Sequence, residues 1–377
     1  MKKSMRRALA FVLALGMMVS LTACGGSDSG KTTAAESGSQ AEGGSKAEDG
    51  AQAEGGYEGV ELVVATWGWT AANVKELAAD FEKQYGCTIV IDETSGNSDR
   101  LNKIMAQKDS PEIDVALMTK NFAEIGNKEG LFEKIDTDVV KSLDNLYDFA
   151  KDANGYGPCY SLVRYGIMYD SDVVTEAPKS YADLFDDKYA GMVSLPDMTS
   201  TAGPYMLVAM AESLGGGDEG IEAAFELMTE KKDNIASWYT ASSDVQQGFT
   251  TGEVSLTVFM DMNMPTLTDA GLKMAWVDAE EGSFAAAASI NVVKGCKNPE
   301  LAQLFVEYML SDEIQSKVAE SLNEAPTSKN ATMPEEMKSY LAYGADAMDA
   351  LKTFDEDYIS EHKQEWVDRF QREVAIQ

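Results

Sequence analysis

Residues 61–92, ELVVATWGWTAANVKELAADFEKQYGCTIVID, contain the pattern that decides the fold. Residues 61–66 are a short apolar run, as expected for a buried strand. Apolar residues then recur at helical spacing from Val74 onward, and Gly86 is placed to end that helix. A second strand is expected at residues 88–91. A strand, a helix and a strand in this order predict one unit of an α/β fold with a parallel sheet.

The same alternation continues along the chain. Asn97 or Ser98 is placed to cap the next helix, and residues 113–118 form the next expected strand. Further strands are expected at residues 192–195, 236–239 and 254–260, with helices at 201–214, 220–231 and from Asn298-Pro299-Glu300 onward. Two long apolar segments, residues 156–170 and 285–293, have the length of strands that cross between lobes. We therefore expect an α/β fold in two lobes, each with a mostly parallel sheet flanked by helices.

The N-terminus has the features of an export signal. Lys2, Lys3, Arg6 and Arg7 precede an apolar run that is too short to span a membrane as a helix. The sequence Leu21-Thr22-Ala23-Cys24 resembles the bacterial lipobox, in which the cysteine is acylated before cleavage. We expect a signal peptide at residues 1–23 and a lipid anchor, carrying acyl chains such as palmitate, at Cys24. The alternative is an ordinary secretory signal that happens to contain a cysteine.

The segment after Cys24 cannot build a core. Residues 25–56 contain no aromatic and no branched aliphatic residue. Such a composition predicts a solvated, flexible spacer, so we assign residues 24–57 to an acylated linker. A spacer of this kind would let a folded domain move above the membrane to which the acyl chains bind.

Composition excludes several classes of function. The chain of 377 residues carries a formal net charge of −32, and loss of the four basic signal residues would make it −36. Such a charge repels phosphate backbones, so we expect no nucleic-acid partner. With one histidine, His362, zinc hydrolases and Ser-His-Asp chemistry are disfavoured. The cysteines fit no metal motif, and we expect no metal and no cofactor. Cys87, Cys159 and Cys296 are interpreted as buried hydrophobic residues, with one internal disulfide as the alternative.

Six segments, in order along the chain, resemble one known family. They are residues 81–90 (FEKQYGCTIV), 111–115 (PEIDV), 165–170 (YGIMYD), 178–191 (PKSYADLFDDKYAG), 252–254 (GEV) and 294–304 (KGCKNPELAQL). On these segments, the chain from Glu61 onward resembles the type II solute-binding proteins of ABC importers. The resemblance is to the group that contains the spermidine/putrescine-binding proteins.

The resemblance implies the periplasmic-binding-protein type II fold and a function. Lobe 1 would comprise residues 58–162 plus 289–328, and lobe 2 residues 163–288 plus 329–377, joined by crossover hinge strands. A small solute would bind in the cleft and be enclosed by hinge closure, without catalysis. The implied partners are the solute, the permease and ATPase subunits of an ABC transporter, and the membrane through Cys24. We expect a monomer on the extracytoplasmic face of the cell membrane.

Ligands of open parallel sheets sit at the carboxyl ends of strands, which points to the residues that follow each expected strand. In the first lobe these candidates are Trp67, Trp69, Thr70, Ser95, Asn97 and Thr119. The tryptophans offer stacking faces for a cation or a flat ligand, although either could pack under its loop. Ser95 and Asn97 suit an anionic or hydroxyl group, or could simply cap a helix. Lys120 follows Thr119 and has the character of a solvated surface lysine.

The second lobe and the crossover supply the other candidates. Thr199, Ser200 and Thr201 could bind a carboxylate or phosphonate at a helix start, or cap that helix; Trp238, Tyr239 and Asp261 follow two later strands. Asp261 is the acidic candidate for a cationic ligand. Arg164 lies in the first crossover, where it could clamp an anionic ligand or form a structural salt bridge.

Two acids that the resemblance implies for a polyamine site are missing. The aligned positions hold Ala288 and the pair Thr199-Ser200. Because buried ammonium groups without partners cost several kcal/mol, a polyamine is disfavoured. We expect an acidic or zwitterionic solute instead: an amino acid-like compound, a phosphonate, or a quaternary amine with a carboxylate. A polyamine remains the alternative.

Two other classes of function were also considered. One is a secreted carboxylate-based hydrolase, with Asp197 and Asp261 as its candidate catalytic acids, and the other is a sensor subunit.

Overall fold

The apolar run at residues 61–66 forms the buried strand β1 (Glu61–Trp67), which pairs in parallel with β2 (Thr88–Thr94) and β3 (Val115–Thr119). The computed structural model describes residues 56–94, 96–200 and 202–375, all within one unit, Ala53–Gln377. The signal peptide, Cys24 and the linker up to residue 55 lie outside the described residues. The helical stretch between β1 and β2 is two helices, α1 (Ala71–Leu77) and α2 (Ala79–Tyr85). As expected, Gly86 ends α2, with a left-handed φ of 74°.

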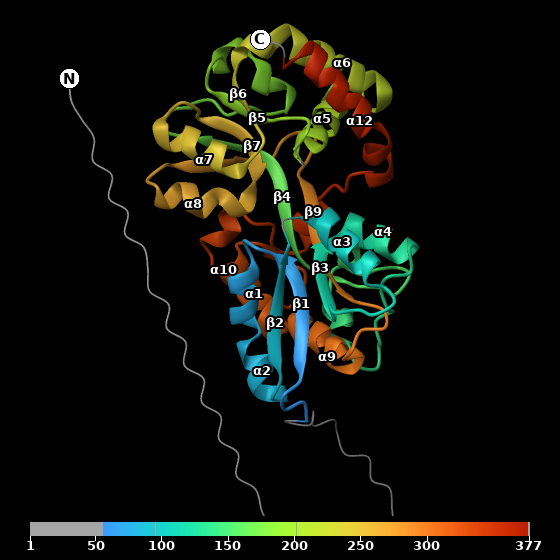
Figure 1. Ribbon diagram of the computed structural model, residues 1–377. Helices are drawn as coiled ribbons and strands as arrows, with labels where there is room; N and C mark the ends of the chain where they lie inside the picture. Colours follow the sequence, from blue (N-terminus) through green and yellow to red (C-terminus); the bar gives the residue numbers. More distant parts are fainter. Residues whose placement is uncertain (1–55, 95, 201, 376–377) are drawn as a thin grey trace, which may run out of the picture. The chain divides into compact units, whose positions relative to one another are not determined.

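The described strands form one ten-stranded mixed sheet rather than two separate ones. Its main path runs β2-β1-β3-β9-β4-β7-β5-β6. The other strands are β4 (Cys159–Asp170), β5 (Val193–Pro196), β6 (Ile235–Tyr239), β7 (Leu256–Met260), β8 (Met274–Val277), β9 (Phe284–Val292) and β10 (Ala325–Pro326). β4 and β9 are the two predicted crossover strands, and both run antiparallel to their neighbours. They join a parallel half made of β1, β2 and β3 to a parallel half made of β5, β6 and β7 (Figure 1).

Helices cover both halves of the sheet. They are α3 (Asn97–Ala106), α4 (Lys120–Lys128), α5 (Ala202–Ser213), α6 (Gly217–Lys231), α7 (Ser242–Thr251), α8 (Met264–Asp269), α9 (Pro299–Leu310), α10 (Asp312–Leu322), α11 (Ala345–Asp349) and α12 (Glu356–Glu373). Short 3-10 helices occur at Lys141–Asn145, Asp148–Ala150, Ala182–Phe185, Asp187–Tyr189, Lys232–Asn234, Asp261–Asn263 and Met337–Ser339. The mixed α/β class with flanking helices is thus as expected.

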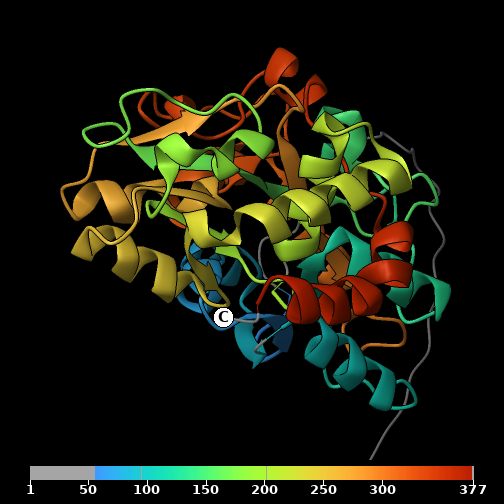
Figure 2. The same cartoon turned by 90° about the horizontal axis from the view of Figure 1, so that it is seen from above.

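Each half of the sheet has its own core. The first core is built on β1, β2 and β3 with α1, α2, α9 and α10, and includes the buried Phe81 and Phe305. The second core is built on β5 and β7 with α5, α6 and α12, and includes Phe225 and Phe370. The chain therefore returns to the second core at its C-terminal end, where α12 packs against α5 (Figures 1 and 2).

One local prediction, the cap of α3, needs correction, and another, the burial of three cysteines, is confirmed. The cap position of α3 is Gly96, not Asn97 or Ser98, because Asn97 is the first helical residue and its amide oxygen is used by β3. Cys87, Cys159 and Cys296 are buried free thiols, as the composition predicted. Burial raises the pKa of both the Cys159 and the Cys296 thiol to about 12.

Candidate functional site

The carboxyl ends of β1 and β3 meet the start of α3 at one edge of the sheet. Asn97 organises this corner: its Oδ1 accepts hydrogen bonds from the Thr119 backbone N–H (3.1 Å) and from Nη1 of Arg100 (3.4 Å). The Thr119 hydroxyl in turn donates to Oδ1 of Asn121, at 2.6 Å. Side chains from two strands and a helix are thereby fixed relative to one another.

Arg100 lies fully buried beneath this corner. Its guanidinium carbon is 4.6 Å from the ring centre of Trp67, and Nη1 donates to the Leu117 carbonyl at 2.6 Å. Burial lowers the pKa of Arg100 to about 10, so the group stays charged at neutral pH. Arg100 therefore supports Trp67 from below by a cation–π contact while it holds Asn97.

A segment near the C-terminus completes the edge of β9. β3 ends at Thr119, opposite Ala288, so the first part of β9 has no strand beside it on that side. Lys352 occupies this place: its N–H donates to the Ser283 carbonyl (2.9 Å), and its carbonyl accepts from the Ala285 N–H (3.1 Å). We call residues 351–357 the C-terminal strap.

Phe354 of the strap is held between two other rings. It stacks on Tyr205 of α5 with centroids 4.1 Å apart and on Phe284 of β9 at 4.4 Å. Tyr205 also meets Tyr165 of β4 edge to face, at 5.5 Å. Stacked aromatic contacts of this kind add about 0.5–1.5 kcal/mol per pair beyond area burial, so the strap is firmly attached to the second core.

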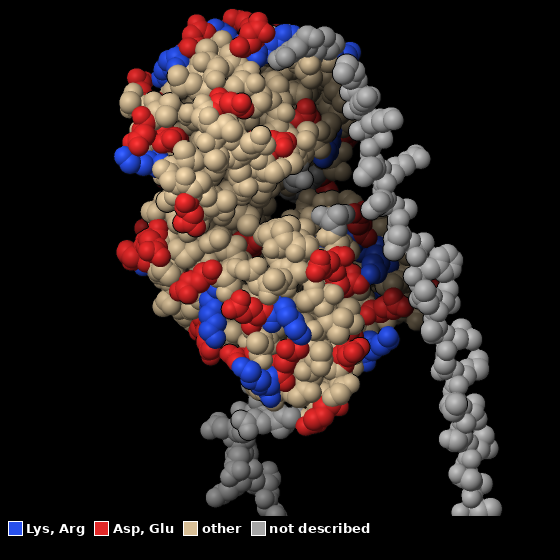
Figure 3. All heavy atoms as spheres, turned by 60° about the vertical axis from the view of Figure 1, so that its left-hand side comes forward, with Lys and Arg blue, Asp and Glu red and all other residues tan. Residues whose placement is uncertain are grey.

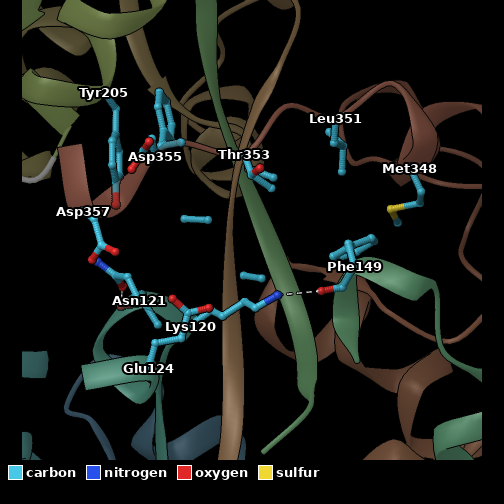
Figure 4. Close-up of a pocket in the computed structure, with 15 residues that line it drawn as sticks. Lys120, Asn121, Glu124, Phe149, Tyr205, Met348, Leu351, Thr353, Asp355 and Asp357 are labelled. Atoms are coloured by element: carbon cyan, nitrogen blue, oxygen red, sulfur yellow. Dashed lines mark hydrogen bonds between the residues drawn. The ribbon is translucent and has the colours of Figure 1, made fainter. Parts of the chain in front are cut away.

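Two adjoining cavities lie between these features. One, of about 330 Å³, is floored by Ala285, Ala286 and Ala287 of β9 and walled by the strap (Figure 4). The other, of about 520 Å³, includes Trp67 and the start of α3. They share the lining residues Thr119, Asn121, Glu124, Tyr205, Ala286 and Asp357, which come from both halves of the sheet. We treat them as one cleft; the surface is hollowed between the two halves in Figure 3.

Side chains of both charge signs line the cleft. The lining lysines among the described residues are Lys120, Lys128 and Lys363, and the lining acids are Asp99, Glu124, Asp355 and Asp357. Lys120 stretches across the floor, and its Nζ donates to the Phe149 carbonyl at 3.0 Å (Figure 4). Lys128 and Asp357 form an exposed ion pair at 3.4 Å that joins α4 to α12. The cleft thus offers an ammonium group and several carboxylates within one small volume.

Three of the residues predicted from sequence line the cleft: Trp67, Asn97 and Thr119. Trp69 does not line it; its side chain is 55% exposed and its ring centre lies 5.9 Å from that of Trp67. Thr70 is buried, and its hydroxyl donates to the Trp67 carbonyl at 3.0 Å. Ser95 and Thr201 lie outside the described residues.

Arg164 and Asp261, both predicted to meet ligand, are paired with each other. Nε of Arg164 donates to one Asp261 carboxylate oxygen at 3.1 Å, and the Arg164 backbone N–H donates to the other at 3.0 Å. Asp261 is completely buried, and burial raises its pKa to about 6 although Arg164 opposes the rise. The arginine also lies 4.7 Å from the Trp276 ring centre. Neither residue lines the cleft.

The other predicted residues of the second half also lie away from the cleft. Thr199 donates from its N–H and its hydroxyl to Asp197 Oδ1, and the Ser200 hydroxyl accepts from the Gly203 N–H at the start of α5. Trp238 packs edge to face on Phe370, and the Tyr239 hydroxyl donates to the Val258 carbonyl. These contacts cap a helix and fill cores.

Several lining residues were not predicted from the sequence. Lys120 directly follows β3, and residues that follow strands were the candidates for ligand contact. It was nevertheless interpreted as a surface residue, because most lysines are solvated. Tyr205 lies one turn into α5, where apolar periodicity predicts only a core residue. Phe354 follows no strand, and nothing local in the sequence marks it as part of a cleft.

The described part of the chain shows no sign of a metal centre or of a membrane-spanning helix. It contains no group of three or more histidine, cysteine, aspartate or glutamate residues placed to hold a metal ion. None of its helices combines the length and the apolar character needed to cross a bilayer.

Comparison with known proteins agrees with this architecture. A family model described as bacterial extracellular solute-binding protein matches residues 76–345. The spermidine/putrescine-binding periplasmic protein of Salmonella typhimurium is 24% identical over 265 residues, which cover 68% of this chain and 75% of the relative. The gamma-aminobutyric acid-binding protein of Pseudomonas aeruginosa is 24% identical over 326 residues, 82% and 89% of the two chains.

A solved structure gives a closer match in sequence. The crystal structure of an ABC transporter from Clostridium perfringens is 34% identical, with a TM-score of 0.72, and the match covers 83% of this chain and 99% of that one. A spermidine/putrescine ABC transporter substrate-binding protein from Streptococcus pneumoniae, 19% identical, has the same TM-score over 83% and 99% of the two chains. These matches confirm the periplasmic-binding-protein type II fold expected from the sequence.

Proposed function

This chain belongs to the family of bacterial extracellular solute-binding proteins, and we propose that its solute is a small zwitterion, with an ammonium group at one end and a carboxylate or phosphonate at the other. The solute would sit on the alanines of β9, between Lys120 and the carboxylates of Glu124 and Asp357. A permease and an ATPase of an ABC importer would receive it.

The observation that carries this proposal is the mixture of charges in the cleft. Lys120 brings an ammonium group into the cavity that the small side chains of Ala286 and Ala287 also line. The hydrogen bond from its Nζ goes to the neutral carbonyl of Phe149, at 3.0 Å, so its charge is available to an anionic group. Glu124 and Asp357 line both cavities and would serve the ammonium end.

A polyamine is the second candidate, and the names of the Salmonella and Streptococcus relatives favour it. The cleft argues against it, because Lys120 would repel an ammonium group placed on the β9 floor. The stretch of β9 beneath the cleft carries alanines and no acid. The name of the Pseudomonas relative supports a zwitterion, since γ-aminobutyrate has one group of each sign.

Titration calorimetry on the Lys120→Met variant tests the choice. We expect the wild-type chain to bind γ-aminobutyrate or 2-aminoethylphosphonate more tightly than putrescine or spermidine. Loss of one charge-assisted hydrogen bond should weaken zwitterion binding about 10- to 100-fold in Lys120→Met. Lys83→Met, at an exposed lysine that pairs with Asp80 on α2, is the matched control and should bind as the wild type does. Tighter binding of the polyamines by the wild type would contradict the proposal.

We also propose that the chain is a lipoprotein anchored through Cys24 and that its two lobes, residues 58–162 plus 289–328 and 163–288 plus 329–377, close around the solute as a monomer. The lipobox-like sequence and the polar spacer support the anchor. Growth with labelled palmitate should label the wild-type protein, and Cys24→Ser should remove the label and release the protein from the membrane fraction. Retention of the label in Cys24→Ser would exclude this anchor.

We further propose that the chain is not an enzyme. Of the two acids considered for a hydrolase, Asp261 is buried and paired with Arg164, and Asp197 holds the turn before α5. Neither lines the cleft, so the two do not converge on a shared substrate position there. A sensor role would use the same closed, liganded form.

A further inference from the structure

The C-terminal strap contributes a wall of the cleft from outside the part of the chain that the family model matches. That match ends at residue 345, whereas the lining residues of the cleft continue to Lys363. Among them, Phe354 and Asp355 belong to the strap itself. The cleft floor and the strand exits at Asn97 and Thr119 therefore come from the family's matched region, but this wall and Trp67 do not.

The strap is held in place independently of any ligand. Lys352 pairs with the backbone of β9, and Phe354 is stacked on both faces. Directly after Phe354, Asp355 accepts a hydrogen bond from the Tyr358 N–H (2.9 Å) and so caps α12. Tyr358 then ties α12 to Asp218, to which its hydroxyl donates at 2.7 Å. Hydrogen bonds at Lys352 and at Asp355 thus hold the strap on both sides of Phe354.

We propose that Phe354 is a specificity-determining residue that sets the maximum length of the solute. Its two faces are covered by Tyr205 and Phe284, so the rim of the ring is the part that meets the cavity. A covered ring cannot stack on a ligand cation, but it can stop a chain of methylenes that runs along the alanine floor. This inference rests on one part of the proposed function, namely that the solute binds in this cleft.

The size of the effect follows from packing. In a closed pocket, one extra methylene group changes discrimination by about 10- to 200-fold, because it must displace protein atoms or find an empty space. The stacked ring cannot move aside without breaking its two aromatic contacts. Removal of the ring would leave space for a longer solute. A larger ring would reduce the length of solute that the cleft accepts.

The test measures chain-length preference in three variants of the full chain. The probes are two series that differ only in methylenes: the ω-amino acids from β-alanine through γ-aminobutyrate to ε-aminocaproate, and the α,ω-diamines from 1,3-diaminopropane to cadaverine. Affinities come from calorimetry, and the readout is the ratio between successive members of whichever series the wild type binds. Binding of diamines alone would contradict the proposed zwitterion, yet would leave the length test intact.

Phe354→Ala should shift the preferred length upward, with the ratio in favour of the longer member rising about tenfold or more. Phe354→Trp should shift it downward, which keeps the test decisive if the alanine variant folds poorly. Tyr358→Ala is the matched control, since it removes an aromatic ring that also ties the C-terminal segment to the second half but does not line the cleft. It should leave the length ratio unchanged. An unchanged ratio in both Phe354 variants, or an equal shift in Tyr358→Ala, would overturn the proposal.

Discussion

Two buried carboxyl groups lie beside β4, those of Asp261 and Glu324, and burial shifts the pKa of both in the same direction. Burial raises the pKa of Glu324 to about 7, with a hydrogen bond from the Ser161 hydroxyl opposing the rise and the charge of Asp261 adding to it. Burial likewise raises the pKa of Asp261 to about 6. Both acids therefore bind protons more tightly in the folded chain than in the unfolded one, and their ionisation costs stability.

Glu324 should make the chain less stable as the pH rises from about 4.5 to about 7. Below this window both states are protonated; within it the folded state holds more protons, so the free energy of unfolding falls with rising pH. Above pH 7 the free energy of unfolding stays lower by a constant amount, about 3 kcal/mol. Glu324→Gln should remove this loss, so its stability relative to wild type should be greater at pH 8 than at pH 5.

Urea unfolding at both pH values measures the difference. Glu320→Gln, at an exposed position of α10 four residues before Glu324, is the control for loss of a carboxylate and should show little pH-dependent difference. An equal stability difference between Glu324→Gln and wild type at pH 5 and pH 8 would contradict a raised pKa of Glu324 in the folded chain.

The Arg164–Asp261 pair should matter for stability more than for ligand chemistry. Asp261→Asn leaves the Arg164 cation, which is 8% exposed, without its main partner and should lower the free energy of unfolding by about 3–5 kcal/mol. The double variant Asp261→Asn with Arg164→Met removes the stranded charge and should recover part of this loss. Chemical denaturation checks both, with Asp269→Asn as an exposed control at the end of α8. A double variant less stable than Asp261→Asn would contradict this interpretation.

At the scale of elements, the entry into β4 depends on a close approach of two backbones. A Cβ on Gly157 would lie 2.2 Å from Asn291 Oδ1 and 2.3 Å from the Ile290 carbonyl oxygen, both in β9. The Ile290 N–H also donates to the Pro158 carbonyl at 2.9 Å, so the strands cannot separate without losing a bond. The two crossover strands are therefore locked together where the chain passes from one half of the sheet to the other.

Gly157→Ala should consequently destabilise the chain by about 1–3 kcal/mol, the usual range for an overpacked site. Gly96→Ala is the control, because a Cβ there meets no atom within 4 Å and the residue has an extended backbone with φ of −158°. Thermal unfolding compares the two. Equal melting temperatures for Gly157→Ala and wild type would show that β4 and β9 can separate at this point.

The elements were largely predictable from sequence, whereas the cleft was only partly so. Strands such as β1 and β3, and the start of α9 at Asn298-Pro299, follow from local periodicity and capping. Trp67, Asn97 and Thr119 followed from the rule that ligands meet strand ends. The position of Phe354 depends instead on a backbone bridge between Lys352 and Phe284, which are far apart in sequence. The pairing of Arg164 with Asp261 is equally non-local, since it needs β4 and β7 to be neighbours.

At the scale of the whole molecule, total charge and local charge carry different information. The net charge of −32 describes the exterior and would draw in any cation. The cleft is instead lined by lysines as well as acids, and Lys120 lies on its floor. The choice between a polyamine and a zwitterion is therefore made by the placement of a few side chains between the two halves.

The most direct test of this account is a calorimetric titration of the wild-type chain with γ-aminobutyrate and, separately, with putrescine. These molecules share a chain of four carbons and one ammonium group, and differ in whether the other end is a carboxylate or a second ammonium. We predict saturable binding of γ-aminobutyrate that is at least tenfold tighter than binding of putrescine. Tighter binding of putrescine would contradict the central claim that the cleft selects a zwitterion.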